Sequence, residues 1–274
     1  MIVTFIGGGN MASALIGGRI AAGASPRDFR VVEPFDAQRA ALAARFAGIA
    51  LYPGVTGDAV ADAGVAVIAV KPQQARDAAK ALAPHVAALP VVLSIAAGIR
   101  GVDLSRWLGG YPRIVRAMPN TPALVGAGIS GLWAAPAVDA TARDAAASLL
   151  RAGGDVLWFD DEASLDAVTA VSGSGPAYVF YLLEAMEAAA IDVGLAQPAA
   201  RRLAYATVAG GMALAQARDA DPATLRAEVT SKGGTTARAV ETLERHGVKE
   251  AFVEAIRGAA LRAKEMGDEF GRDA

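Results

Sequence analysis

The chain has 274 residues, enough for one large domain or two ordinary ones, and its 54% hydrophobic and 20% charged residues are typical of a globular protein. The formal net charge of −2 is spread without blocks of like charge, so we expect no nucleic-acid partner. The chain contains no cysteine, which excludes disulfides, thiolate catalysis and cysteine metal sites. Its two histidines stand far apart, so we expect no metal centre.

Two uncharged segments are not expected to be targeting or membrane segments. Residues 1–18 lack a basic leading region and carry three glycines and Asn10 in their middle, unlike a signal peptide. Residues 117–138 contain prolines and glycines that would leave backbone groups unpaired in lipid. We therefore expect a cytoplasmic protein that contacts no membrane.

Short β-branched runs alternate with alanine-rich segments in the first part of the chain. The predicted strands are residues 2–6, 30–32, 65–70, 91–95, 113–118, 128–133 and 156–159. The predicted helices are residues 11–22, 37–46, 75–82 and 140–150. Strands that alternate with helices predict βαβ units and a mainly parallel sheet covered on both faces.

The strand pattern ends near residue 160. Residues 178–191, 199–217, 236–243 and 249–266 are predicted helices, several with apolar residues at three- and four-residue spacing. We therefore place a boundary between an α/β domain, residues 1–159, and an all-α domain, residues 160–274. Residues 203–217 carry little polar surface, so we expect the helical domain to bury them against a second copy of the chain.

The first predicted strand runs directly into a glycine-rich turn, Gly7 to Ala12, that fits the pattern G-x-G-x-x-A. Gly7 permits a tight turn, Gly9 lets the backbone approach a pyrophosphate, and Ala12 keeps the following helix close to the sheet. The alternative is a plain strand-to-helix turn. The strand before, the helix after and the second strand at the right distance favour a dinucleotide site.

Glu33 follows the second strand, where a carboxylate can accept hydrogen bonds from the adenosine ribose. It would also repel a 2′-phosphate, which favours NADH. Glu33 pointing into solvent, with Arg39 close enough to meet a phosphate, is the alternative that favours NADPH. Both cofactors therefore stay open.

The loops after the later strands are expected to line the same crevice, because ligands bind at the carboxyl ends of parallel strands. One loop is residues 70–73, and the other is residues 94–98, whose small side chains would let a nicotinamide ring lie close. Lys71 is a candidate catalytic residue. Alternatively, the aliphatic part of its side chain simply packs, with its ammonium group near phosphate or solvent.

A glycine pair precedes the helix predicted at residue 236. Gly233 and Gly234 would expose backbone N–H groups to a small acid's carboxylate, as expected at the start of a helix. The hydroxyl of Thr236 could then hydrogen-bond a neighbouring substrate atom. Alternatively, Thr235 or Thr236 is simply the N-cap of the helix.

The chain resembles the pyrroline-5-carboxylate reductases, which make L-proline in the last step of its biosynthesis. The resemblance runs from Ile2 to about Met266 and rests on the segments F-I-G-G-G-N-M, A-V-K-P-Q, S-I-A-A-G, M-P-N-T-P, S-G-S-G-P-A-Y and T-S-K-G-G-T-T. It implies a Rossmann-type doubly wound sheet followed by an all-α dimerisation domain. It also implies homodimers that assemble further into a homodecamer, with the site between the Rossmann domain of one subunit and the helical domain of its partner.

The same resemblance implies particular site residues for NADPH or NADH and for a cyclic imine. The expected cofactor residues are Ile6, Gly7, Gly8, Gly9, Asn10, Met11, Glu33, Thr56, Ala69, Val70, Lys71, Pro72, Ile95, Ala96 and Ala97. The resemblance places Glu162, Thr235 and Thr236 near the substrate. Together with Gly233 and Gly234 from the glycine pair above, these are the expected substrate residues, and Thr236 is the expected catalytic residue. Glu162 has a plainer alternative as an acidic residue in the first turn of a helix.

Two departures from the family pattern and two other functions stay open. Glu33 and Pro34 stand where some members carry serine or arginine, and Thr56 and Glu228 replace amide side chains of some relatives. A β-hydroxyacid dehydrogenase on the same scaffold would need a proton donor, for which Lys232 is the local candidate. A dinucleotide-binding sensor without turnover is the other alternative.

Overall fold

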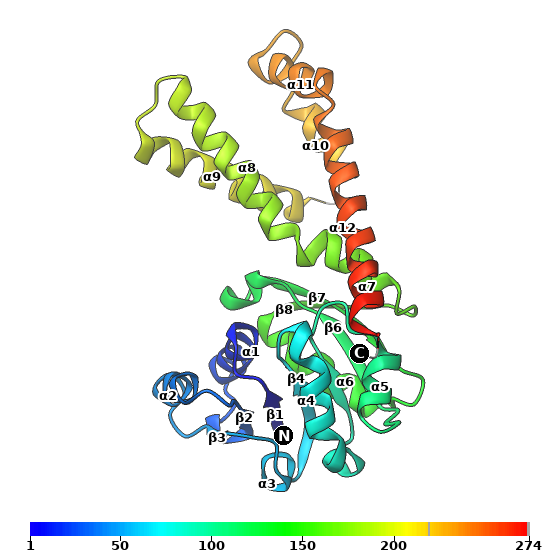
Figure 1. The fold of residues 1–274 in the computed structure, drawn as a ribbon. Coiled ribbons are helices and arrows are strands. Elements are labelled where there is room, and N and C mark those ends of the chain that lie inside the picture. Colours follow the sequence, from blue (N-terminus) through cyan, green and yellow to red (C-terminus); the bar gives the residue numbers. More distant parts are fainter. Residues whose placement is uncertain (219, 273–274) are drawn as a thin grey trace. The chain divides into compact units, whose positions relative to one another are not determined.

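The computed structural model describes residues 1–218 and 220–272, which pack into two compact units (Figure 1). The first unit joins Met1–Ser174 to the last part of the chain, from Ala259 onward. The second unit is Gly175–Gly258.

An eight-stranded sheet forms the centre of the first unit, in the order β3-β2-β1-β4-β5-β6-β7-β8. Its strands are β1 Ile2–Ile6, β2 Phe29–Val32, β3 Ala50–Tyr52, β4 Ala63–Ile68, β5 Val92–Ser94, β6 Ile114–Met118, β7 Gly128–Ala134 and β8 Gly154–Trp158. Neighbouring strands are parallel except for β6 and β7, which pair antiparallel. The order of the first six strands is that of a Rossmann fold, and the expected mainly parallel sheet is confirmed.

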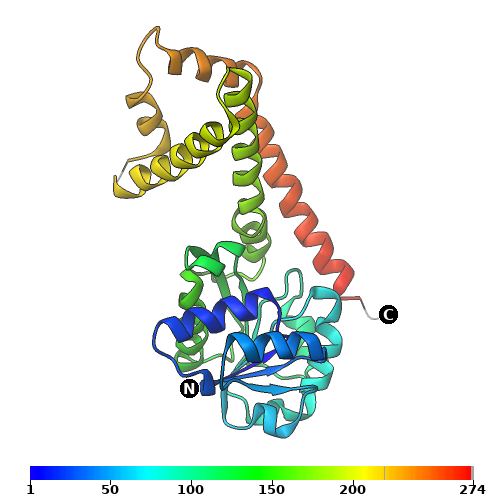
Figure 2. The same ribbon diagram turned by 90° about the vertical axis from the view of Figure 1, so that its left-hand side faces the viewer.

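Helices cover both faces of this sheet (Figures 1 and 2). The helices on one face are α1 Asn10–Ala21, α2 Asp36–Arg45 and α6 Ala140–Leu150, and those on the other are α3 Gly57–Val60, α4 Ala75–Leu82 and α5 Gly101–Trp107. In β4, Val65 and Val67 pack on the first face while Ala66 and Ile68 pack on the second. Burial on both faces explains why the strand is a continuous apolar run.

The last turns of α12, Val248–Phe270, belong to the first unit. Arg100 Nη2 lies 2.7 Å from Asp268 Oδ1, and Arg106 Nη2 donates to the carbonyl of Gly271 at 2.7 Å. Arg76 Nη2 donates to the carbonyl of Arg272 at 2.6 Å. Cations at this end of a helix satisfy free carbonyls and oppose the helix dipole.

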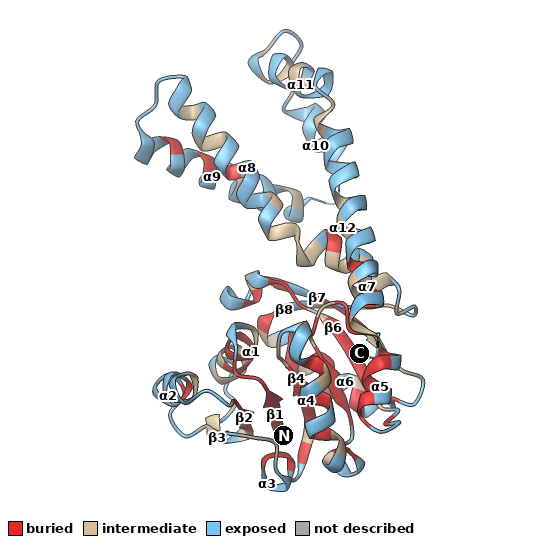
Figure 3. Cartoon of the chain, viewed as in Figure 1, coloured by how far each residue is buried: buried red, intermediate tan, exposed pale blue. Residues whose placement is uncertain are grey.

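The second unit is helical, and most of its residues are exposed (Figure 3). It comprises α8 Gly175–Asp192, α9 Gln197–Ala217, α10 Pro222–Glu228, α11 Thr235–Arg245 and the first part of α12. The exposed apolar residues of α8 and α9 include Phe180, Tyr181, Leu203, Tyr205, Met212 and Leu214. None of the helices in the described part of the chain is both long and apolar enough to span a membrane.

The predicted strands and helices are all present; β1, α4 and α6 have the predicted bounds, and the others are shifted at one or both ends. The change from α/β to helical structure after Trp158 is confirmed. The short elements β3, α3, α5, α7 (Ser164–Val168) and α10 were not predicted. The boundary at residue 160 between two functional domains stays a prediction.

Candidate functional site

The glycine turn lies where the strand order reverses, because β2 and β4 flank β1 on opposite sides. Gly7 has a φ of +104°, and its N–H donates to the carbonyl of Val32 at 2.8 Å. A Cβ at Gly7 would lie 2.8 Å from the carbonyl oxygen of Ala69 in the loop after β4. The tight turn therefore requires glycine, and it stands at the position where Rossmann folds bind dinucleotides.

The start of α1 is open to an anion. The helix begins at Asn10 after Gly9, without a side-chain cap and without an acidic residue in its first turn. The first N–H groups of a helix have no partner within it, so they can point at a ligand. A Cβ at Gly9 would meet nothing within 4 Å, whereas Ala12 is fully buried against the sheet. The space and the free donors fit a pyrophosphate.

Glu33 is buried, with 7% of its surface exposed. Its Oε2 accepts a hydrogen bond from the N–H of Gly8 at 3.0 Å, and its Oε1 accepts one from the N–H of Phe35 at 3.1 Å. The alternative in which Glu33 points into solvent is therefore wrong. Arg39 pairs with Asp36 and donates to the backbone carbonyl of Glu33 at 2.6 Å.

The loops after β4 and β5 continue beside the glycine turn. The N–H of Ala69 donates to the carbonyl of Ile6 at 2.8 Å, and the N–H of Ile95 donates to that of Ile68 at 3.1 Å. The structure thus brings together the ends of β1, β4 and β5, which hold the predicted residues Ile6 to Met11, Ala69 to Pro72, and Ile95 to Ala97.

Two predicted cofactor residues lie at short helices. Lys71 is exposed and precedes a 3-10 turn, Pro72–Gln74. Thr56 caps α3 by accepting a hydrogen bond from the N–H of Ala59 at 3.2 Å. Their contacts with a cofactor stay predictions.

The second glycine pair lies at the start of α11, in the helical unit. Gly234 is the N-cap and α11 begins at Thr235, so the alternative in which a threonine is the N-cap is wrong. The N–H of Gly234 closes a turn onto the carbonyl of Ser231 at 3.0 Å, which corrects the expectation that both glycines expose this group. The free donors at this end are those of the first helical turn. Among the described residues, no hydrogen-bond partner contacts the hydroxyl of Thr236.

Glu162 lies in a charged cluster of the first unit. Its Oε1 accepts hydrogen bonds from Arg116 Nη1 at 2.7 Å and from the N–H of Gly101 at 2.6 Å. These charges line an open cavity of about 760 Å³ together with Arg100, Asp166 and Asp268. Burial raises the pKa of Asp166, and the nearby guanidinium groups of Arg116 and Arg100 oppose that shift.

Arg116 was not among the residues predicted from the sequence, although one signal for it was present. It is a lone charge within the apolar strand β6 and is 7% exposed. Arginine is almost never buried to this degree without a partner, so its position predicts an acidic partner but does not say which one.

Two of the diagnostic segments meet in the first unit. Asn120 of M-P-N-T-P is buried, and its Nδ2 donates to the carbonyl of Ser172 at 3.2 Å, while its Oδ1 accepts from the N–H of Ile129 at 3.0 Å. Ser172 belongs to a π-helical turn, Thr169–Gly173, directly before α8. Such turns occur frequently at functional sites.

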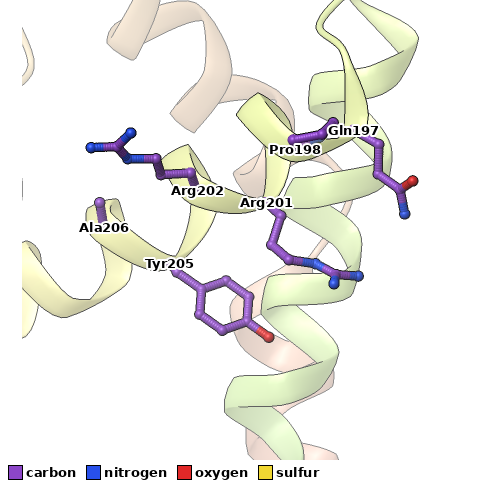
Figure 4. Close-up of a pocket in the computed structure, with 6 residues that line it drawn as sticks. All are labelled: Gln197, Pro198, Arg201, Arg202, Tyr205 and Ala206. Carbon is purple, nitrogen blue, oxygen red and sulfur yellow. The ribbon is translucent and has the colours of Figure 1, made fainter.

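A separate hollow lies on α9, with a volume of about 700 Å³ (Figure 4). Its lining residues are Gln197, Pro198, Arg201, Arg202, Tyr205 and Ala206. Arg201 Nε is paired with Glu187 Oε2 at 3.1 Å, and none of the predicted site residues lies here. Over residues 1–218 and 220–272, no group of three or more His, Asp or Glu side chains could hold a metal ion.

Comparisons with known proteins cover nearly the whole chain. Residues 162–266 match the family model for pyrroline-5-carboxylate reductase dimerisation, and residues 2–98 match that for NADP oxidoreductase, coenzyme F420-dependent. The match to a dimerisation model supports self-association of the helical region.

Relatives and solved structures agree with these matches. A pyrroline-5-carboxylate reductase of Pseudomonas aeruginosa is 43% identical over 98% of this chain and 98% of that protein. The structure of a pyrroline-5-carboxylate reductase from Coxiella burnetii is 37% identical with a TM-score of 0.89, covering 96% of this chain and 97% of that one. The structure of a Plasmodium falciparum pyrroline carboxylate reductase with NADP bound is 26% identical with a TM-score of 0.86. The match covers 97% of this chain and 98% of that one. The chain therefore belongs to the pyrroline-5-carboxylate reductase family.

Proposed function

We propose that this chain is an NAD(P)H-dependent oxidoreductase that reduces the imine of 1-pyrroline-5-carboxylate to L-proline. The observation that carries the proposal is the 43% identity to a pyrroline-5-carboxylate reductase over 98% of both chains. The uncapped start of α1 at the strand-order reversal supports it, because it offers a place for the cofactor's pyrophosphate.

The cofactor half of the proposed site is built from backbone groups. The N–H groups of Gly9, Asn10 and Met11 would hold the pyrophosphate, and the small residues Ala96 and Ala97 would let the nicotinamide ring lie close to the end of β5. The reduced nicotinamide supplies hydride when bound. The protein's contribution is to orient the ring and to exclude water.

The substrate half would use the start of α11. The substrate's carboxylate would bind the free N–H groups beside Gly233 and Gly234, which explains how a chain of net charge −2 holds an anion without an arginine clamp. The hydroxyl of Thr236 would hydrogen-bond the ring nitrogen while the neighbouring carbon receives hydride. A protonated imine is already an electrophile, so this step needs little further acid–base catalysis.

We further propose that the chain forms homodimers through its helical region, that these assemble into a homodecamer, and that a site combines the cofactor half of one subunit with α11 of its partner. The exposed apolar side chains of α8 and α9 support an assembly that buries them. The cytoplasmic location also stays a prediction.

One assay tests the proposed reaction. The purified protein is mixed with racemic 1-pyrroline-5-carboxylate and with NADPH or NADH, and both the loss of absorbance of the reduced cofactor and the formation of proline are measured. We expect turnover with formation of proline. Cofactor binding without oxidation would instead indicate a sensor. Activity on β-hydroxyacids that is abolished by Lys232→Met, with none on the imine, would indicate a hydroxyacid dehydrogenase.

A further inference from the structure

Gly8, the middle residue of the glycine turn, has both of its backbone polar groups held by side chains from elsewhere. Its N–H donates to Glu33 Oε2 at 3.0 Å, and its carbonyl accepts a hydrogen bond from Gln38 Nε2 at 2.6 Å. Glu33 follows β2 and Gln38 lies on α2. The segment from β2 to α2 therefore holds the glycine turn through two hydrogen bonds.

Packing fixes the turn further. A Cβ at Gly8 would lie 2.6 Å from Leu42 Cδ1 of α2 and 3.1 Å from Val31 Cγ1 of β2. Gly8 is therefore enclosed between the strand and the helix, and Leu42 lies one turn after Gln38 on α2.

These bonds decide which donors a ligand can use. The N–H of Gly7 is bonded to the carbonyl of Val32 and that of Gly8 is bonded to Glu33, so neither is free for a phosphate. The N–H groups from Gly9 onward stay open at the start of α1. The hydrogen bonds to Gly8 thus fix the position and orientation of these free N–H groups.

We propose that Gln38 and Glu33 are positioning residues that fix the glycine turn, through Gly8, in the shape that binds the pyrophosphate. The inference rests on the proposed cofactor use and deepens it. The pyrophosphate is common to NADH and NADPH. Loss of the hydrogen bonds to Gly8 should therefore lower the affinity for both cofactors by the same factor. Gln38 is the better probe, because it is neutral, whereas a change at Glu33 also alters repulsion of a 2′-phosphate.

The test uses Gln38→Met and Gln38→Leu, two uncharged substitutions that remove the amide donor; methionine also keeps the length of the side chain. Ala41→Met is the matched control, because Ala41 is exposed on the same helix. Dissociation constants for NADH and NADPH are measured by fluorescence, together with kcat and KM. Amide hydrogen exchange of residues 6–12 is followed without cofactor, and circular dichroism checks the fold.

We expect both Gln38 variants to raise the two dissociation constants by the same factor, about 3- to 10-fold, as for one lost hydrogen bond. Exchange in the turn becomes faster, and kcat at saturating cofactor stays unchanged. Unchanged dissociation constants, an effect on one cofactor alone, or an equal effect of Ala41→Met would overturn the inference. Failure of the wild-type protein to bind either cofactor would overturn the proposed function as well.

Discussion

Glu162 Oε1 lies 2.7 Å from Nη1 of Arg116 and joins the turn before α7 to a buried strand of the sheet. The side chain of Arg116 is 8% exposed and that of Glu162 is 25% exposed. The same carboxylate oxygen accepts a hydrogen bond from the N–H of Gly101 at the start of α5. The pair therefore connects β6, the turn before α7 and the start of α5. Its contribution to the free energy of unfolding can be measured.

Glu162→Gln should lower the free energy of unfolding by about 1–3 kcal/mol, because the buried guanidinium of Arg116 loses a charge-assisted hydrogen bond. Denaturant unfolding of Glu162→Gln, Arg116→Met and the double variant at one protein concentration gives the coupling between the two side chains. Glu241→Gln is the control, since its pair with Arg238 is exposed and should contribute little. Independent effects of the two substitutions would contradict a direct interaction.

Asp166→Asn should make the folded protein more stable at neutral pH. Burial raises the pKa of the Asp166 carboxyl, so the folded state holds this proton more tightly than the unfolded state does. The contribution of the Asp166 carboxyl to the free energy of unfolding is fully present below the ordinary pKa of aspartate. It is lost as the pH rises through the raised pKa of the folded state. The difference in melting temperature between variant and wild type should therefore grow with pH across that window. A difference in melting temperature that shrinks with rising pH would show that folding lowers the pKa of Asp166 instead.

Gly9→Val should abolish cofactor binding while the protein still folds. A Cβ at Gly9 meets no protein atom within 4 Å, so the side chain enters the space left for the pyrophosphate. Gly9→Ala should have an intermediate effect. Titration with NADH and NADPH, with melting temperature as the check on folding, tests this. Wild-type affinity in Gly9→Val would place the dinucleotide elsewhere.

Thr236→Val should reduce kcat by roughly 10- to 100-fold, the effect of losing one hydrogen bond that acts in the transition state. Cofactor affinity should stay the same, and Thr236→Ser, which keeps the hydroxyl, should restore most of the activity. Steady-state kinetics with direct cofactor titration tests both. A fall in cofactor affinity with kcat intact would move Thr236 out of the substrate site.

The sequence predicted the main sheet and helices because their apolar runs are long and regular. The strand β4 is buried on both faces, and the glycine turn directly follows β1, so local patterns were sufficient. The strand β3 has three half-buried residues and α5 has seven residues with charges among them. Such short elements depend on contacts with distant parts of the chain, which periodicity does not report.

The backbone geometry of the glycine turn was predictable from its motif, as at Gly7 and Gly9. It was not predictable where function depends on partners far apart in sequence. Arg116 meets Glu162 across 46 positions, and Gln38 reaches Gly8 across 30. Glu33 was predicted to contact the adenosine ribose, whereas its bond to the backbone of the glycine turn required coordinates. Predicted contacts with cofactor and substrate stay predictions.

The arginine contacts to the end of α12 bear on how the protein is made. Residues from Ala259 onward pack with Met1–Ser174, so the unit that holds the glycine turn is composed of the first and the last parts of the chain. During synthesis its sheet can leave the ribosome long before the carbonyls of Gly271 and Arg272 are available to Arg106 and Arg76. The unit that holds the glycine turn therefore becomes complete only after residues 271 and 272 have been synthesised.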